Sequence, residues 1–148
     1  MFDILHRVGI ASAPENVYAA LTTQRGLSGW WTNDVAGDGA NVGDAVHFQF
    51  GERGFFDMKV LRADPGERLL WEAVDGPSEW IGTTLSWDLR REGDYTIVLF
   101  KHAGWNEPVE FMHHCSTKWA VFLLSLKELV ETGKGRPFPD DMKIDDWN

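Results

Sequence analysis

Residues 109–132 read VEFMHHCSTKWAVFLLSLKELVET, and this stretch decides the fold. Apolar side chains recur in it at spacings of three and four, which is the period of one face of an α-helix. They are Met112, Cys115, Trp119, Phe122, Leu126 and Leu129, joined by Leu123 and Val130. We predict one helix over Val109–Thr132, which ends at Gly133. Either Asn106 or Glu107 caps its start, and Pro108 fits its first turn.

The length of this helix sets the architecture around it. At 1.5 Å per residue, its 24 residues make about 36 Å, whereas a strand of six residues spans roughly 20 Å. Nothing else in the chain is long enough to cover the apolar face of a sheet. We therefore expect the helix to lie right across a sheet.

The middle of the chain predicts antiparallel hairpins. The segment Asp64-Pro65-Gly66-Glu67 has Pro and Gly at the two central positions of a type II turn. The resulting pairs are Val60 with Trp71 and Met58 with Ala73. With Glu92 and Gly93 at the centre of the next turn, the predicted pairs are Leu89–Thr96, Trp87–Val98, Leu85–Phe100 and Thr83–His102. One face of this hairpin is apolar, which is typical of a one-sided antiparallel sheet.

The first 50 residues predict strands and short helices in alternation. Ser12 and Glu15 match a capping box at the start of the first short helix. The other predicted elements are a strand over Ile4–Ala11, a second short helix or turn over Gln24–Trp31 that Gly26 and Gly29 break, a hairpin loop over Asn33–Val42 and its return strand over Asp44–Phe50.

These elements together predict an α+β protein with the helix-grip fold. Its curved antiparallel sheet has six or seven strands wrapped around one long C-terminal helix, with two short helices after the first strand. Because the length suits one compact domain, we expect a single domain over residues 1–148. Residues 135–148 are too apolar for a solvated end, so we expect them to pack on the domain or on a neighbouring copy.

The composition excludes several classes of protein and partner. A formal charge of −9 repels phosphate backbones, so we expect no nucleic-acid partner. The longest apolar run, Trp119–Leu126, is far below the roughly 20 residues of a membrane span, so we expect no membrane insertion. The first residues carry no secretory signal, and the single cysteine suits a reducing compartment. We therefore expect a cytoplasmic protein.

Aromatic residues are the unusual feature of the composition, with eight Trp, nine Phe and two Tyr. They either fill the core or line a cavity between the sheet and the long helix, since apolar pockets are lined by such side chains. The candidate ligand-binding residues are Trp30, Trp31, Phe48, Met58, Trp71, Trp87, Phe100, His102, Trp105, Trp119 and Phe122.

A search for catalytic and metal-binding motifs finds none, so we expect no metal and no cofactor. His113, His114 and Cys115 are consecutive, and neighbours on a helix diverge by about 100°, so they cannot converge on one ion. Cys115 falls on the apolar stripe and reads as a packing residue. His102 is left with two interpretations: a group that binds a ligand or transfers a proton, or a histidine satisfied by a backbone group.

Four segments resemble a known family: PENVYAALT at residues 14–22, GWW at 29–31, TIVLFKH at 96–102 with GW at 104–105, and SLKELVETG at 125–133. In their order and spacing they resemble the START-related helix-grip (SRPBCC) superfamily, in the branch of the activator of the heat-shock protein 90 ATPase. The resemblance covers about residues 2–136. It implies the fold deduced above.

The resemblance implies three functions, because the superfamily includes lipid and polyketide binders, cyclases and hydrolases. We expect a small hydrophobic ligand, lipid-like or polyketide-like, to bind between the sheet and the long helix. One alternative is a protein-interaction module like the chaperone activator, although that activator has a further N-terminal domain, so chaperone contact is the weaker expectation. Another is a cyclase or hydrolase that uses His102; we lean towards a protein without catalysis. A homodimer is also open, with Val121, Leu124, Ile97 and Leu99 as contacts.

Overall fold

The helix predicted from the apolar period is α3, which covers Glu110–Thr132 in the computed structural model of residues 1–148. Gly133 ends it in the left-handed conformation, with φ of 89°, as predicted. The prediction for its start is wrong. Val109 is the N-cap residue, with extended backbone and no capping side chain, so neither Asn106 nor Glu107 caps the helix and the helix starts after Pro108.

Seven strands form one antiparallel sheet in the order β1-β7-β6-β5-β4-β3-β2. The strands are β1 (Phe2–Ile10), β2 (Asp34–Ala36), β3 (Ala45–Gln49), β4 (Phe55–Asp64), β5 (Arg68–Asp75), β6 (Thr84–Glu92) and β7 (Tyr95–Trp105). Because every neighbour in the order is antiparallel, the predicted fold class is confirmed. The strand β2 was missed, since it lies within the segment that we predicted as a hairpin loop.

Two short helices follow the first strand, as predicted: α1 (Pro14–Thr22) and α2 (Gln24–Trp30). Ser12 does not cap α1. Its N-cap residue is Ala13, and the Ser12 hydroxyl instead accepts from the Asn16 side chain at 2.9 Å. Gly26 does not break α2; it lets α2 pack closely on α1, because a Cβ at Gly26 would lie 2.5 Å from the Ala20 Cα.

The predicted register is correct for the pairs named in the first hairpin and wrong for the second hairpin. The pairs Val60–Trp71 and Met58–Ala73 are present between β4 and β5. The pairs across β6 and β7 are displaced by two residues, and the observed partners are Leu89–Val98, Trp87–Phe100 and Leu85–His102. The reason is the turn: Glu92 pairs with Tyr95, so Gly93 and Asp94 are the central residues. Gly93 has φ of 61°, which the first central position of a type II′ turn requires.

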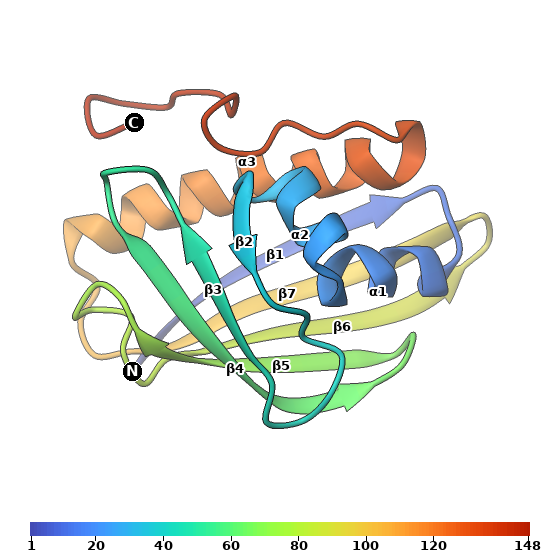
Figure 1. Cartoon of the computed structure of the whole chain (residues 1–148), viewed down its shortest axis with the longest axis horizontal. Helices are drawn as coiled ribbons and strands as arrows, with labels where there is room; N and C mark the ends of the chain where they lie inside the picture. Colours follow the sequence, from blue (N-terminus) through green and yellow to red (C-terminus); the bar gives the residue numbers. More distant parts are fainter.

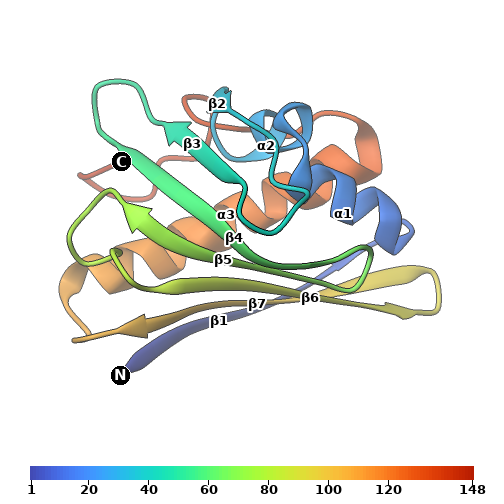
Figure 2. The ribbon, with the colours of Figure 1, turned by 60° about the horizontal axis from the view of Figure 1, so that its bottom comes forward.

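A displacement by two residues keeps every side chain on its predicted face, since strand side chains alternate with period two. The apolar side chains predicted for one face of the β6–β7 hairpin therefore still share the inner face of the sheet. The sheet curves around α3 (Figures 1 and 2). Thirty buried apolar residues from the sheet and all three helices form one core cluster. No helix here has the length and apolar character that crossing a membrane requires.

Residues 134–148 run back along α3 after Gly133 (Figure 1). The first part is fixed by backbone contacts: Phe138 pairs with Thr32 in a parallel bridge, and its N–H donates to the Trp31 carbonyl at 2.8 Å. Gly135 packs so tightly that a Cβ would lie 2.5 Å from the Gly29 carbonyl oxygen. These contacts bring the last residues to the N-terminal half of α3.

Candidate functional site

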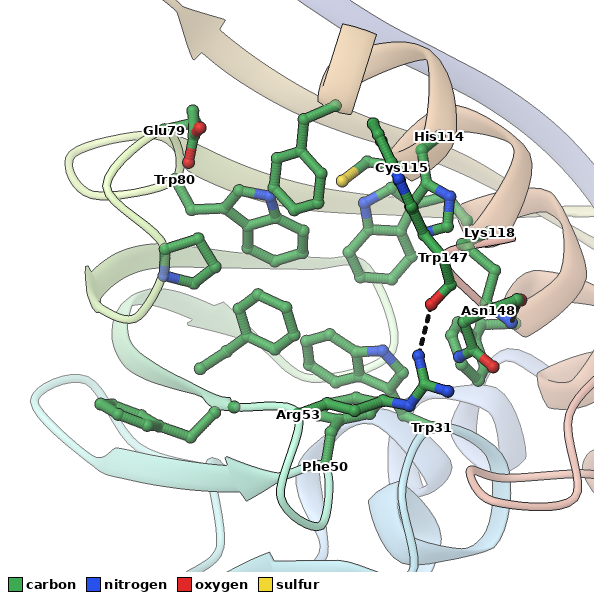
Figure 3. A pocket seen from close by; sticks show the side chains of 17 residues that line it. Trp31, Phe50, Arg53, Glu79, Trp80, His114, Cys115, Lys118, Trp147 and Asn148 are labelled. Carbon is green, nitrogen blue, oxygen red and sulfur yellow. Dashed lines mark hydrogen bonds between the residues drawn. The ribbon is translucent and has the colours of Figure 1, made fainter. Parts of the chain in front are cut away.

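A cavity of about 600 Å³ opens beside the N-terminal half of α3 (Figure 3). The loop between β3 and β4, the loop between β5 and β6 and the end of the chain close its other sides. It is lined by Trp31, Phe50, Arg53, Gly54, Phe55, Phe56, Pro77, Glu79, Trp80, Phe111, His114, Cys115, Lys118, Trp119, Phe122, Trp147 and Asn148. Nine of these 17 residues are Phe or Trp, so the wall is mainly aromatic.

Four of the aromatic rings stack on one another in a row. Phe56 stacks between Trp31 and Trp80, with ring centroids 5.6 Å and 4.0 Å away and planes inclined by 10° and 22°. Trp119 stacks on Trp80 at 6.0 Å and 23°. Together these rings give the cavity an apolar, largely rigid wall.

The polar groups of the cavity lie mostly at the side of α3 and the last residues. The Lys118 ammonium forms an ion pair with the fully buried Asp141 carboxylate and donates to the Met142 carbonyl at 2.9 Å. The Arg53 guanidinium donates to the Trp147 carbonyl (Figure 3). His114 Nδ1 lies 2.7 Å from the Asp145 carboxylate. These contacts hold the last residues against the cavity.

Asp141 is ionised although it is 4% exposed. Burial alone would raise its pKa, but the hydrogen bonds and charges of Lys118 and Lys143 outweigh burial and hold the pKa below its ordinary value. The ion pair is therefore intact at neutral pH.

Cys115 lines the cavity as a neutral thiol. Burial raises its pKa to about 12, so almost no thiolate exists at neutral pH. The prediction that Cys115 is a packing residue agrees with its 5% exposure. No group of three or more His, Cys, Asp or Glu side chains is arranged to hold a metal ion.

His102 is completely buried beside the cavity and does not line it. The Thr83 hydroxyl donates to the Trp80 carbonyl at 2.6 Å, so its oxygen accepts from His102 Nε2 at 2.9 Å. On the other side of the ring, Trp119 Nε1 donates to Nδ1 at 3.2 Å. Both ring nitrogens are thus occupied in the neutral form, and burial lowers the pKa of His102 to about 3.

The structure brings three of the eleven predicted ligand-binding residues to the cavity: Trp31, Trp119 and Phe122. The remaining eight lie outside its lining, in the core between sheet and helices or, for His102, in the hydrogen-bonded position just described. They are Trp30, Phe48, Met58, Trp71, Trp87, Phe100, His102 and Trp105. Trp30, for example, donates its indole N–H to the Ala20 carbonyl at 2.9 Å and packs edge-on against Trp87.

Sequence reasoning missed most of the cavity because loops and the chain end build it. Phe50, Phe56 and Trp80 lie at strand ends or in a loop, where alternation does not tell inside from outside. A usable signal was the apolar content of residues 135–148, since a Trp or Phe there gains from packing part of its ring on another surface. Trp147 meets that surface at His114, with ring centroids 5.3 Å apart.

Comparison with known proteins identifies the family of the chain. Residues 11–131 match the family model described as Activator of Hsp90 ATPase homolog 1-like protein. The solution structure of the Aha1 dimer from Colwellia psychrerythraea is 46% identical, covers 91% of this chain and 100% of that chain, and superposes with a TM-score of 0.84. No curated protein matches the sequence.

Two more distant structures share the fold. DynU16, a protein of the dynemicin biosynthetic locus, is 21% identical with a TM-score of 0.79; the match covers 90% of this chain and 48% of that chain. CalU16 from Micromonospora echinospora is 21% identical with a TM-score of 0.73, over 93% of this chain and 77% of that one. With the family model, the 46% identical relative and the helix-grip architecture in agreement, the chain belongs to the Activator of Hsp90 ATPase homolog 1-like family.

Proposed function

We propose that this protein binds a small hydrophobic ligand in the cavity beside α3. The observation that carries the proposal is the aromatic wall around about 600 Å³, a volume within the roughly 300–1,000 Å³ of small-molecule pockets. The stacked rings of Trp31, Phe56, Trp80 and Trp119 favour an apolar, lipid-like or polyketide-like molecule. Transfer of its apolar surface from water would supply the affinity.

A fluorescence titration with the neutral dye N-phenyl-1-naphthylamine tests this proposal. One dye molecule per chain is expected to bind saturably, and Cys115→Phe, which places a further ring inside the cavity, is expected to weaken binding about tenfold or more. Cys115→Met serves as a milder filling variant if the Phe variant unfolds. Thr132→Phe adds the same ring to an exposed position at the other end of α3 and is expected to leave the affinity for the dye unchanged. Absence of saturable binding, or equal binding by Cys115→Phe, would contradict the proposal.

The second candidate function is assembly with other protein chains through the surface. The 46% identical protein from Colwellia psychrerythraea is described as a dimer, which supports a homodimer here, and the family's name supports contact with the Hsp90 chaperone. A surface function predicts that Cys115→Phe retains any stimulation of Hsp90 ATP hydrolysis shown by the unaltered protein. Loss of stimulation in that variant, with its fold intact, would count against the surface function.

The enzyme alternative has no support from His102. A catalytic base needs a free lone pair within reach of its substrate. In this structure Nδ1 accepts from Trp119, Nε2 is bonded to Thr83, and neither atom reaches the cavity. We therefore do not propose turnover by this residue.

A further inference from the structure

One edge of the sheet is only partly covered. β1 stands first in the strand order, so just one of its sides is paired, with β7. Further along this free edge, Lys127 Nζ donates to the Gly9 carbonyl at 2.5 Å, and the Ala11 N–H donates to the Glu131 carboxylate at 2.7 Å. The side chains of Lys127 and Glu131 therefore cover the free edge of β1 from Gly9 onwards.

The other part of the free edge, residues 3–7, has no such cover. Backbone groups of a strand point to alternate sides, so Asp3, Leu5 and Arg7 present their N–H and C=O groups to the same outer side as Gly9. No side chain or other strand bonds to these groups on that side. Leu5 is 65% exposed. An open edge of this kind is a template for a further strand.

Apolar side chains flank the open edge on both faces of the sheet. Phe2 is 45% exposed and Leu99 on the neighbouring strand 39% exposed. Leu124, 52% exposed, lies one turn before Lys127 and so on the side of α3 that faces β1. A partner at this edge would bury these groups together with the backbone.

The open edge is complementary to itself. If two copies of β1 meet antiparallel with Leu5 opposite Leu5, then Asp3 of each copy lies opposite Arg7 of the other. Opposite charges at directly opposed positions stabilise a strand pair, and the two-fold arrangement forms this pair twice. Within one chain Arg7 has only a contact of 4.0 Å to Glu92, both side chains being more than half exposed, so it is free to make the new pair. One oxygen of the Asp3 carboxylate, Oδ1, accepts from the Gly104 N–H at 3.1 Å, and the other oxygen is left for Arg7 of the second copy.

From this edge we infer that a second copy of the chain docks antiparallel along residues 3–7 of β1, about a two-fold axis at Leu5. The two sheets become one continuous sheet across the axis. The inference rests on the homodimer proposed above and names its surface.

Charge exchange tests the inference by sedimentation velocity over a range of protein concentrations. Asp3→Arg and Arg7→Asp each place like charges opposite one another twice, and each is expected to weaken the dimer about tenfold. The double variant restores opposite charges and is expected to regain most of the loss. Arg90→Asp is the matched control, because Arg90 also pairs with Glu92, at 3.2 Å, but lies on β6 inside the sheet.

A second variant covers the case in which a charge exchange disturbs the fold. Leu5→Lys keeps Asp3 and Arg7 and puts two ammonium groups at the axis, so it is expected to give a monomer with an unchanged circular dichroism spectrum. A dimer that none of these variants weakens would overturn the inference while leaving the homodimer. An unaltered protein that stays monomeric at all concentrations would overturn both.

Discussion

The hydrogen bonds of His102 suit the neutral imidazole ring, so protonation of this residue destabilises the folded state. In the folded chain Nδ1 accepts from the Trp119 indole N–H, so a proton added there would meet another donor. Burial lowers the pKa of His102 to about 3, whereas an unfolded chain has about 6.5. The unfolded state therefore binds more protons between these values, and stability falls as pH falls below 6.5.

We predict that the free energy of unfolding decreases by about 2 kcal/mol between pH 7 and pH 5 through this one residue. Urea unfolding at a series of pH values measures it. His102→Gln should lower stability overall and flatten this slope, because its side chain does not titrate. His113→Gln, on an exposed position of α3, should keep the slope of the unaltered protein. Equal slopes in all three proteins would show that His102 does not cause this pH dependence of the free energy of unfolding.

At the level of a whole segment, the buried Asp141 carboxylate ties residues 134–148 to α3, in addition to the backbone contacts of Phe138. The Asp141 side chain has no exposure, and it receives Lys118 from α3 and Lys143 from its own segment. Its lowered pKa means that this stabilisation is present above the ordinary value near 3.9 and is lost as pH falls through the folded value. Removing one charge leaves a buried ammonium group without its partner.

We predict that Asp141→Asn lowers the free energy of unfolding by about 3 kcal/mol and exposes the segment to trypsin at Lys143. Thermal unfolding and limited proteolysis measure the two effects. Asp140→Asn changes the exposed neighbouring carboxylate and should match the unaltered protein in both. An Asp141 variant with unchanged stability would show that the segment is held by its backbone contacts alone.

The elements that sequence could predict are those whose pattern is local. The period of α3 and the Pro-Gly turn at residues 65–66 needed no distant contacts, and both were right. The register of β6 and β7 failed because Gly93 could take either central position of a tight turn. The predicted N-caps were wrong because Ser12 and Asn106 are only residue types that suit an N-cap. The direction in which the chain enters each helix decides which residue occupies the N-cap position.

The cavity is a property of the assembled molecule, and that is why sequence predicted only part of it. Trp31, Trp119 and Phe122 were found because they lie on or beside predicted helices. The side chains of Arg53 and Trp147 are 94 positions apart and meet only after the sheet has curved around α3. The alternation of strands ranks residues as inside or outside, but it does not separate a cavity wall from a filled core.

Net charge sets how two whole molecules approach each other. Each copy carries −9, so two copies roughly 30 Å apart repel by about 11 kcal/mol in water before screening. The pairs inferred between Asp3 and Arg7 of two copies would lie at the surface and would contribute far less. We predict that raising NaCl from about 20 to 150 mM strengthens self-association, because screening removes the long-range repulsion first. Sedimentation at both salt concentrations measures it, and weaker association at high salt would contradict it.

The unequal exposure of the indole rings gives the molecule an optical label of its own. Seven of the eight tryptophans are buried, while Trp147 is 44% exposed at the mouth of the cavity. A polar collisional quencher such as acrylamide should therefore reach the emission of that one ring and leave the others bright. A change in the quenchable fraction reports on events at the cavity entrance without any dye attached to the protein.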